Sequence, residues 1–289
     1  MKNVTIIGAG SDLGVHIDGA RFGPKKILDN VSNNHKKILL EQDTNIIKSQ
    51  DKLDLRKNED KVNSFNKKLY DVITKENNFC ITIGGDHSIA IASGLASLKK
   101  HKNLGIIWID AHLDYNTWET TITGNIHGLP LATLNGLNKE LSEFHDNTYF
   151  NPKNTVVVGY RAYEDNAIDE INNTSLMGVT VYTTKDIKEY GIKKILKQAL
   201  DIASNKTDGI HISFDLDVID PNLAKGVKVK EKNGLNLDEV KEIINFLIKQ
   251  NNIKSFDLVE YNPLNDSDNK TIEIASKILD EILKSTTLK

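Results

Sequence analysis

Residues 105–114 read GIIWIDAHLD, an apolar run that ends in alternating acidic and histidine residues. Two other segments repeat this arrangement: residues 80–88 read CITIGGDHS, and residues 210–220 read IHISFDLDVID. Continuous apolar, β-branched runs are typical of strands in a parallel sheet that is covered on both faces. Charged side chains in such a core are costly unless they are paired or hold a cation. Because open α/β sheets bind ligands at the carboxyl ends of their strands, the three segments predict a metal site.

The polar residues of these segments form one candidate ligand set. Residues i and i+2 of a strand point to the same face, so the side chains of Asp215 and Asp217 converge. The set comprises two imidazoles and four carboxylates, namely His87, Asp110, His112, Asp114, Asp215 and Asp217. A closed zinc site takes four ligands, whereas two divalent ions about 3.5–4 Å apart use a larger set. Oxygen-rich ligation with imidazole and without cysteine favours Mn²⁺ over Zn²⁺.

Length and composition are those of one large α/β domain that covers residues 1–289. The chain has a net charge of −3 and 39 % hydrophobic residues. It has no apolar run of the roughly eighteen residues that a membrane span needs, and residues 1–4 lead into a strand rather than a signal peptide. The single cysteine, Cys80, is predicted to be buried rather than nucleophilic. We expect a cytoplasmic protein without nucleic-acid or membrane partners.

Strand-like and amphipathic helical segments alternate along the chain. Besides the three strands above, the predicted strands are residues 4–7, 156–159, 179–182 and 255–259. Apolar residues at helical spacing predict helices over residues 62–74, 89–99, 187–203, 237–249 and 271–283. Such alternation predicts a parallel sheet with helices on both faces. Residues 30–60, rich in asparagine and lysine, are interpreted as surface loop and helix without a motif.

Together, the motifs resemble those of the arginase/agmatinase (ureohydrolase) family of manganese enzymes. Residues 19–24 (GARFGP), the three metal segments and residues 257–263 (DLVEYNP) follow the family's order over nearly the whole chain. The resemblance implies a three-layer αβα sandwich with a mostly parallel central sheet, two Mn²⁺ ions per subunit and a homo-oligomer, a trimer or hexamer. It also implies the ligands of each ion: His87, Asp110, Asp114 and Asp215 for one, and Asp110, His112, Asp215 and Asp217 for the other.

Hydrolysis of a guanidino or formimino group fits this ligand set. A guanidinium carbon is a poor electrophile, because the cation is resonance-stabilised, and it requires a strong nucleophile. Two cations lower the pKa of a bridging water from about 15.7 towards neutrality and so supply hydroxide. Glu260 is predicted to hold the guanidinium by a charge-assisted hydrogen bond, and His127 to pass a proton to the leaving amine. Asp114, a metal ligand, is the third predicted catalytic residue.

A loop after the second metal segment indicates which substrate is bound. Residues 114–128 look like the arginase loop that recognises an α-carboxylate. The predicted hydrogen-bonding residues of this loop are Asn116, Thr121, Thr123 and Asn125. Glu164 is the match to the acidic residue that contacts the substrate amino group in the family. L-Arginine, hydrolysed to L-ornithine and urea, is therefore the first-ranked substrate.

Two segments keep other members of the family open as alternatives. Residues 19–24 look more like the agmatinase or formimidoylglutamase version of their motif. Lys228, Val229 and Lys230 occupy the places of a Gly-Thr-Pro sequence that arginases carry beside the substrate. Formimidoylglutamase or another guanidino-acid hydrolase is the second-ranked activity and agmatinase the third, and a catalytically weak metal-binding relative is a further alternative. We expect both lysines to face solvent.

The remaining histidines and two aromatic residues near the motifs carry no predicted function. His211 alternates into the sheet and is expected in the core. The histidines expected at the surface are His16, His35, His101 and His145. Trp108 and Tyr160 are expected to serve packing.

Overall fold

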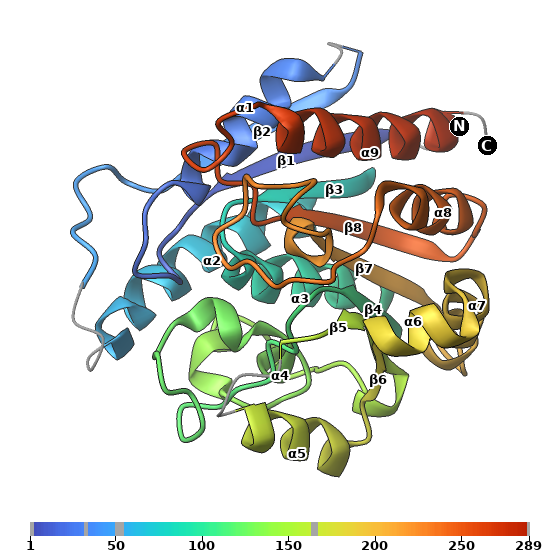
Figure 1. Ribbon diagram of the computed structural model, residues 1–289. Coiled ribbons are helices and arrows are strands. Elements are labelled where there is room, and N and C mark those ends of the chain that lie inside the picture. The colour runs from blue at the N-terminus through green and yellow to red at the C-terminus, as the bar shows by residue number, and fades with distance from the viewer. Residues whose placement is uncertain (1–2, 32–33, 50–54, 163–166, 288–289) are drawn as a thin grey trace.

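The computed structural model describes residues 3–31, 34–49, 55–162 and 167–287. At its centre lies an eight-stranded sheet in the order β2-β1-β3-β8-β7-β4-β5-β6, in which the described neighbours all run parallel (Figure 1). The strands are β1 (Val4–Gly10), β2 (Lys36–Glu41), β3 (Phe79–Gly84), β4 (Leu104–Ile109), β5 (Thr155–Tyr160), β6 (Thr180–Thr183), β7 (Gly209–Asp215) and β8 (Ile253–Val259). The predicted parallel sheet is confirmed.

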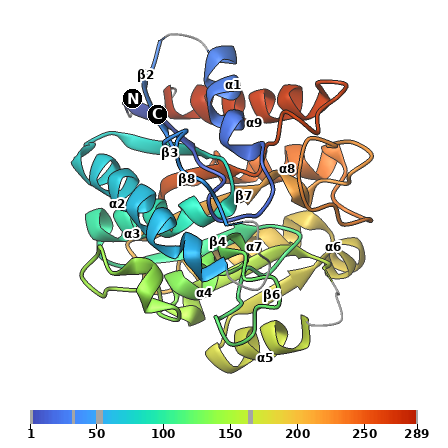
Figure 2. The same cartoon turned by 90° about the vertical axis from the view of Figure 1, so that its left-hand side faces the viewer.

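Helices cover both faces of the sheet (Figure 2). They are α1 (Gly23–Asn30), α2 (Glu59–Lys75), α3 (Ala90–His101), α4 (Pro130–Leu134), α5 (Ala167–Met177), α6 (Thr184–Tyr190), α7 (Ile192–Ala203), α8 (Leu237–Leu247) and α9 (Lys270–Thr287). One apolar core lies between the sheet and helices α1, α7, α8 and α9, and a second lies between the sheet and helices α2, α3 and α4. Successive residues of β4 alternate between them, since Ile106 packs in the second core and Ile107 in the first. The predicted three-layer sandwich is confirmed.

Four neighbouring strands in the middle of the sheet carry the predicted site. Strands β3, β8, β7 and β4 are adjacent and parallel, so their carboxyl ends meet at one edge. The three metal segments follow β3, β4 and β7, and Glu260 follows β8. The parallel pairing therefore gathers residues that are as much as 173 positions apart in the sequence.

The interpretation of residues 30–60 as surface loop and helix is wrong, because this stretch contains β2. The strand pairs with β1, with Ile38 opposite Ile7. Its sequence, KKILLE, is only partly buried, because β2 lies at the edge of the sheet and has one neighbour. Charged residues at both ends are typical of an edge strand and hid its β pattern in the sequence. The same stretch also contributes a buried lysine, Lys48.

The helix predicted over residues 187–203 is divided into two. Helix α6 begins after a capping box in which Thr183 and Asp186 bond each other's backbone N–H groups. It ends at Tyr190, because the next residue, Gly191, has a φ of +80° outside the helical region, and α7 begins at Ile192. The apolar spacing continues across this break, so the pattern alone predicted one helix.

Two expectations from the composition can be compared with the structure. Cys80 is buried, and burial raises the pKa of its thiol, so its predicted core position is confirmed. Among the described helices, none has the length and apolar character that a membrane crossing requires.

Gly159, at the end of β5, provides a test of packing beside the site. Its φ is +108°, and a Cβ atom there would lie 2.5 Å from Val218 Cγ2 and 3.0 Å from the carbonyl oxygen of Asp110. We expect Gly159→Ala to lower the free energy of unfolding by about 1–3 kcal/mol, because both backbone conformation and packing oppose a side chain. Urea denaturation measures the difference. Gly128→Ala is the control, since no described atom lies within 4 Å of a Cβ there. Equal losses in both variants would contradict this account.

Candidate metal centre and substrate pocket

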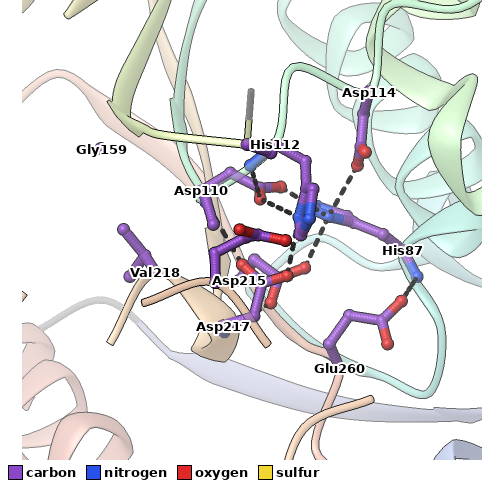
Figure 3. Close-up of polar contacts among 12 residues, drawn as sticks. His87, Asp110, His112, Asp114, Gly159, Asp215, Asp217, Val218 and Glu260 are labelled. Carbon is purple, nitrogen blue, oxygen red and sulfur yellow. Dashed lines mark hydrogen bonds and ion pairs between the residues drawn. The ribbon is translucent and has the colours of Figure 1, made fainter. Parts of the chain in front are cut away.

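The predicted metal ligands meet in a pocket at the carboxyl edge of the sheet (Figure 3). His87 follows β3, the residues from Asp110 to Asp114 follow β4, and Asp215 and Asp217 lie at the end of β7. Five of the six line the pocket, and Asp110 is fully buried beside them. The folded chain therefore brings together all six residues that the sequence singled out.

His87 is the centre of one group of ligands. Its Nδ1 atom lies 3.1 Å from carboxylate oxygens of both Asp110 and Asp114. The same atom lies 3.0 Å from Asp215 Oδ2. Three carboxylates thus converge on one imidazole nitrogen.

His112 is the centre of a second group. Its Nδ1 atom lies 2.9 Å from Asp217 Oδ2 and 3.5 Å from Asp110 Oδ1. Potential ligand atoms lie within 4.8 Å of one another in two sets, His87 with Asp110 and Asp215, and Asp110 with His112 and Asp217. Asp110 belongs to both sets, which suits a carboxylate that bridges two cations.

The hydrogen bonds of His87 indicate that the cluster fits a metal ion. Its Nε2 atom lies 2.8 Å from Ser213 Oγ, whereas its buried Nδ1 has no hydrogen-bond partner in the described structure. With the proton on Nε2, the Nδ1 lone pair faces the carboxylates and is available to a cation. A hydrogen bond on the far ring nitrogen is the usual way in which proteins orient a metal-binding histidine.

Crowding of buried charges shifts the pKa values of the cluster. Burial, together with the charges of Asp217 and Asp110, raises the pKa of Asp215 well above its ordinary value. Burial likewise raises the pKa of Asp114 to about 6. Burial lowers the pKa of His87, but its carboxylate neighbours outweigh this and raise it well above the ordinary value. The cluster therefore attracts protons or cations strongly, and a bound cation displaces protons.

Two buried residues support the ligands from behind. Trp108 Nε1 donates a hydrogen bond of 2.9 Å to Asp110 Oδ2, and the indole stacks on the His87 ring with centroids 4.0 Å apart. Trp108 therefore does more than the packing expected of it. The guanidinium of Arg161 donates to the carbonyl oxygens of Asp217 at 2.7 Å and Val218 at 3.0 Å. These bonds fix the turn that follows β7.

Glu260 and His127 lie together above the cluster. Glu260 Oε1 accepts a hydrogen bond of 2.8 Å from the backbone N–H of His87 and lies 3.2 Å from His127 Nδ1. Burial lowers the pKa of His127, but the hydrogen bond and the negative charge of Glu260 outweigh it, so this pKa lies above its ordinary value. Glu260 and Asp114 have φ angles of 67° and 51°. Such left-handed conformations are costly and gather at functional sites.

The four residues of the predicted carboxylate loop, Asn116, Thr121, Thr123 and Asn125, line the same pocket. Thr121 Oγ1 accepts a hydrogen bond of 3.0 Å from the backbone N–H of Gly124. Thr123 Oγ1 accepts one of 3.2 Å from the backbone N–H of Asn125. Because each hydroxyl oxygen serves as an acceptor, its own hydrogen can still be donated to a ligand.

An acidic residue that the sequence did not reveal also lines the pocket. Glu164, the predicted one, lies outside the described residues. Glu170 of α5 lines the pocket, and its carboxylate accepts a hydrogen bond of 2.7 Å from the backbone N–H of Tyr115. Burial raises the pKa of Glu170 to about 7. Nothing in the surrounding sequence IDEI distinguishes this glutamate from one on an exposed helix face.

The histidines outside the predicted site differ in how deeply they are buried. His211 is fully buried between Ser255 Oγ at 2.7 Å and Asp257 Oδ2 at 3.2 Å, so its core position is confirmed. The surface position expected for His145 is wrong, because its side chain is 1 % exposed. His16 is partly exposed and lines the pocket.

The lysines that replace the Gly-Thr-Pro sequence do not face the pocket. Val229 lines it, whereas Lys228 and Lys230 are absent from the described pocket wall. Lys230 is exposed, as expected, whereas Lys228 is partly buried outside the described pocket wall.

Comparison with known proteins identifies the family to which this chain belongs. A family model described as "Arginase family" matches residues 2–284. The chain belongs to the arginase family. The arginase of Bacillus subtilis strain 168 is 35 % identical, over 98 % of this chain and 98 % of its own length. The predicted family, fold and enzyme class, a hydrolase of guanidino substrates, are confirmed.

Two solved structures share the fold over almost the whole chain. The arginase of Bacillus caldovelox has a TM-score of 0.87 and 30 % identity, covering 98 % of both chains. The Entamoeba histolytica arginase in complex with L-ornithine has a TM-score of 0.85 and 30 % identity, covering 97 % of both chains. The central sheet and the layers around it are therefore those of arginase structures.

Asp217→Asn tests the metal centre. We expect a variant with about one fewer bound Mn²⁺ per subunit and little hydrolysis, because an amide cannot supply the negative charge that holds a cation beside His112. Equilibrium dialysis followed by metal analysis measures the ions that remain. Asp220→Asn is the matched control, since Asp220 belongs to the same segment but its carboxylate, among the described residues, accepts hydrogen bonds from Asn222 and Gly234. Full metal content and normal turnover in Asp217→Asn would refute this ligand assignment.

Proposed function

We propose that this protein hydrolyses L-arginine to L-ornithine and urea and that it uses two Mn²⁺ ions. One observation carries the proposal: a single pocket joins the metal cluster, the Glu260–His127 pair and the polar loop of residues 116–125. L-Arginine has a guanidinium at one end and an α-carboxylate at the other, which matches these two parts of the pocket. The relatives from B. subtilis and E. histolytica, both named arginases, support this choice.

The six clustered residues would hold the ions, His87, Asp110, Asp114 and Asp215 one of them, and Asp110, His112, Asp215 and Asp217 the other. When bound, the two ions lower the pKa of a water molecule and supply hydroxide near neutral pH. Ser213 and Trp108 keep His87 and Asp110 in their orientations through the hydrogen bonds described above. The preference for Mn²⁺ rests on the oxygen-rich, cysteine-free ligand set.

Glu260 binds the guanidinium of the substrate in this proposal. Its Oε1 atom already accepts the backbone N–H of His87. Its Oε2 atom accepts from no group in the described residues and can receive a guanidinium N–H. A charge-assisted hydrogen bond of this kind both attracts the cation and orients its planar carbon above the ligands.

His127 moves a proton. Its pKa lies above the ordinary value because of Glu260, which favours the protonated imidazole, and the residue lies at the pocket wall next to Glu260. It can therefore give a proton to the nitrogen that leaves with ornithine when the carbon–nitrogen bond breaks. The backbone N–H of His127 donates to the carbonyl oxygen of Gly14, which fixes the residue at this place.

The polar loop binds the amino-acid end of the substrate. The hydroxyl groups of Thr121 and Thr123 and the amides of Asn116 and Asn125 provide hydrogen bonds for a carboxylate. Glu170 provides a second carboxyl group, which suits the ammonium group beside that carboxylate. Glu164 stays a prediction for the same role.

The alternative substrates differ in whether they carry a carboxylate that this loop can bind. Agmatine has no carboxylate and would leave the loop's polar groups unpaired, so agmatinase activity is disfavoured. A formimidoylglutamate or guanidino-acid substrate carries a carboxylate, but the loop sequence is closer to that of arginases. A cytoplasmic location and assembly into a trimer or hexamer stay predictions.

A panel of substrates with bound Mn²⁺ tests the proposal. We expect kcat/KM for L-arginine to exceed that for agmatine by as much as about 10⁴-fold, because the loop bonds a group that agmatine lacks. Formimidoylglutamate, guanidinobutyrate and guanidinopropionate complete the panel, with urea or the other products measured directly. Equal values for arginine and agmatine, or a higher value for any other member, would sink the arginase assignment.

His127→Asn tests the proton transfer. We expect kcat for arginine to fall by about 10²- to 10⁴-fold, because asparagine at position 127 cannot donate or accept a proton near neutral pH. Mn²⁺ content should stay at the wild-type value, since the residue is not a proposed ligand. The measurement is a kcat profile between about pH 6 and pH 10, which brackets the imidazole titration. An unchanged kcat over that whole range would exclude His127 as the shuttle.

A further inference from the structure

His16 and Asn125 meet at the pocket wall although they are 109 positions apart in the sequence. His16 belongs to the loop after β1, and Asn125 to the loop after β4. Both line the pocket, and Asn125 is only 6 % exposed. A fixed contact between these loops would therefore act directly on the part of the pocket that is proposed to bind the substrate carboxylate.

Two nitrogen atoms of His16 face one oxygen of Asn125. The backbone N–H of His16 donates to Asn125 Oδ1 over 3.3 Å, and His16 Nδ1 lies 3.0 Å from the same oxygen. A backbone N–H can only donate, so the amide atom that faces it must be the oxygen. An oxygen repels a bare ring nitrogen, so Nδ1 must carry a proton and donate as well. The contact thus determines both the amide orientation and the ring tautomer.

The orientation of the amide determines what Asn125 offers to a ligand. With Oδ1 held by His16, the NH₂ group lies on the other side of Cγ, and it donates to no group in the described residues. Its two hydrogens are therefore available in the pocket. If the amide were turned over, an oxygen would take that place and would repel a carboxylate.

His16 is itself held firmly by the backbone around it. The buried ammonium of Lys48 donates to the carbonyl oxygens of Val15 at 3.1 Å and Ile17 at 3.2 Å, the residues on either side of His16. Gly14, two positions before, donates to Asp86 over 2.8 Å. Because the loop is already ordered, little conformational entropy is lost when His16 orients the amide.

We propose that His16 is a positioning residue that orients the Asn125 amide so that the substrate α-carboxylate meets only hydrogen-bond donors there. This inference rests on the proposed function, since it requires a substrate with a carboxylate. It also gives a role to Lys48, and hence to a stretch of sequence that carries no motif.

A pair of variants of similar shape tests the inference. In His16→Asn, an amide N–H can take the place of the Nδ1–H group, whereas His16→Leu keeps only the backbone N–H donor and loses the shorter side-chain contact to Asn125 Oδ1. We expect His16→Leu to weaken binding of L-ornithine to the Mn²⁺-loaded enzyme by about tenfold, the equivalent of roughly 1.4 kcal/mol or one neutral hydrogen bond. Binding of putrescine, which differs from ornithine only in lacking the carboxylate, should be unchanged. His16→Asn should bind both like the wild type.

Isothermal titration calorimetry measures both ligands, and steady-state kinetics on arginine should show a raised KM with kcat nearly constant. Equal weakening of ornithine and putrescine, unchanged ornithine binding in His16→Leu, or failure of His16→Asn to restore it would overturn the inference. If the leucine variant does not fold, His16→Ala serves in its place, because it also lacks the side-chain N–H donor. The wild-type enzyme tests the proposed function separately. If it bound putrescine more tightly than ornithine, the proposal that the substrate carries an α-carboxylate would be wrong, and so would the role of His16.

Discussion

Repulsion among four buried carboxylates is the constraint on which the rest of this structure depends. Asp110, Asp114, Asp215 and Asp217 lie at one edge of the sheet with two imidazoles between them. Burial in a medium of low polarity makes each charge costly, and mutual repulsion adds to that cost. The raised pKa values of Asp215 and His87 favour the protonated forms of these two groups, and divalent cations would neutralise the carboxylates more completely. The same arrangement that is unfavourable without cations is therefore what gives the site its affinity for them.

The hydrogen bonds around the cluster keep this unfavourable arrangement in one geometry. Trp108, Ser213 and Arg161 each bond a ligand or the backbone that carries it. Gly159 leaves room for Val218 and the backbone of Asp110, so the segments after β4 and β7 can approach closely. These residues lie in the packed sheet or directly at its edge, where movement is costly. A site built on such rigid elements holds its ligands in place before any cation arrives.

The sequence predicted the chemistry of the metal site better than it predicted the bounds of the helices and strands or the contacts between loops. Strand ends could be recognised because apolar runs and alternating polar residues depend only on neighbours in the sequence. The parallel sheet then gathers those ends, so all six proposed ligands meet. Strand β2 was missed because an edge strand needs no apolar face. The break between α6 and α7 was missed because one glycine, Gly191, does not interrupt the apolar spacing. His16, Lys48 and Glu170 gave no signal, since their surroundings are set by contacts between distant loops.

These observations divide the pocket into two parts with different origins. The reacting end is made by strand ends, whose positions follow from the sheet, and it contains the cluster with Glu260. The other end is made by loops, and the Lys228–Lys230 segment, which departs from the arginase pattern, falls there. Val229 alone of that lysine segment reaches the described pocket wall, so the two added charges make no direct contact with a substrate there. Changes in the loops can therefore alter which molecule is held, while the hydrolytic end, fixed by the sheet, stays the same.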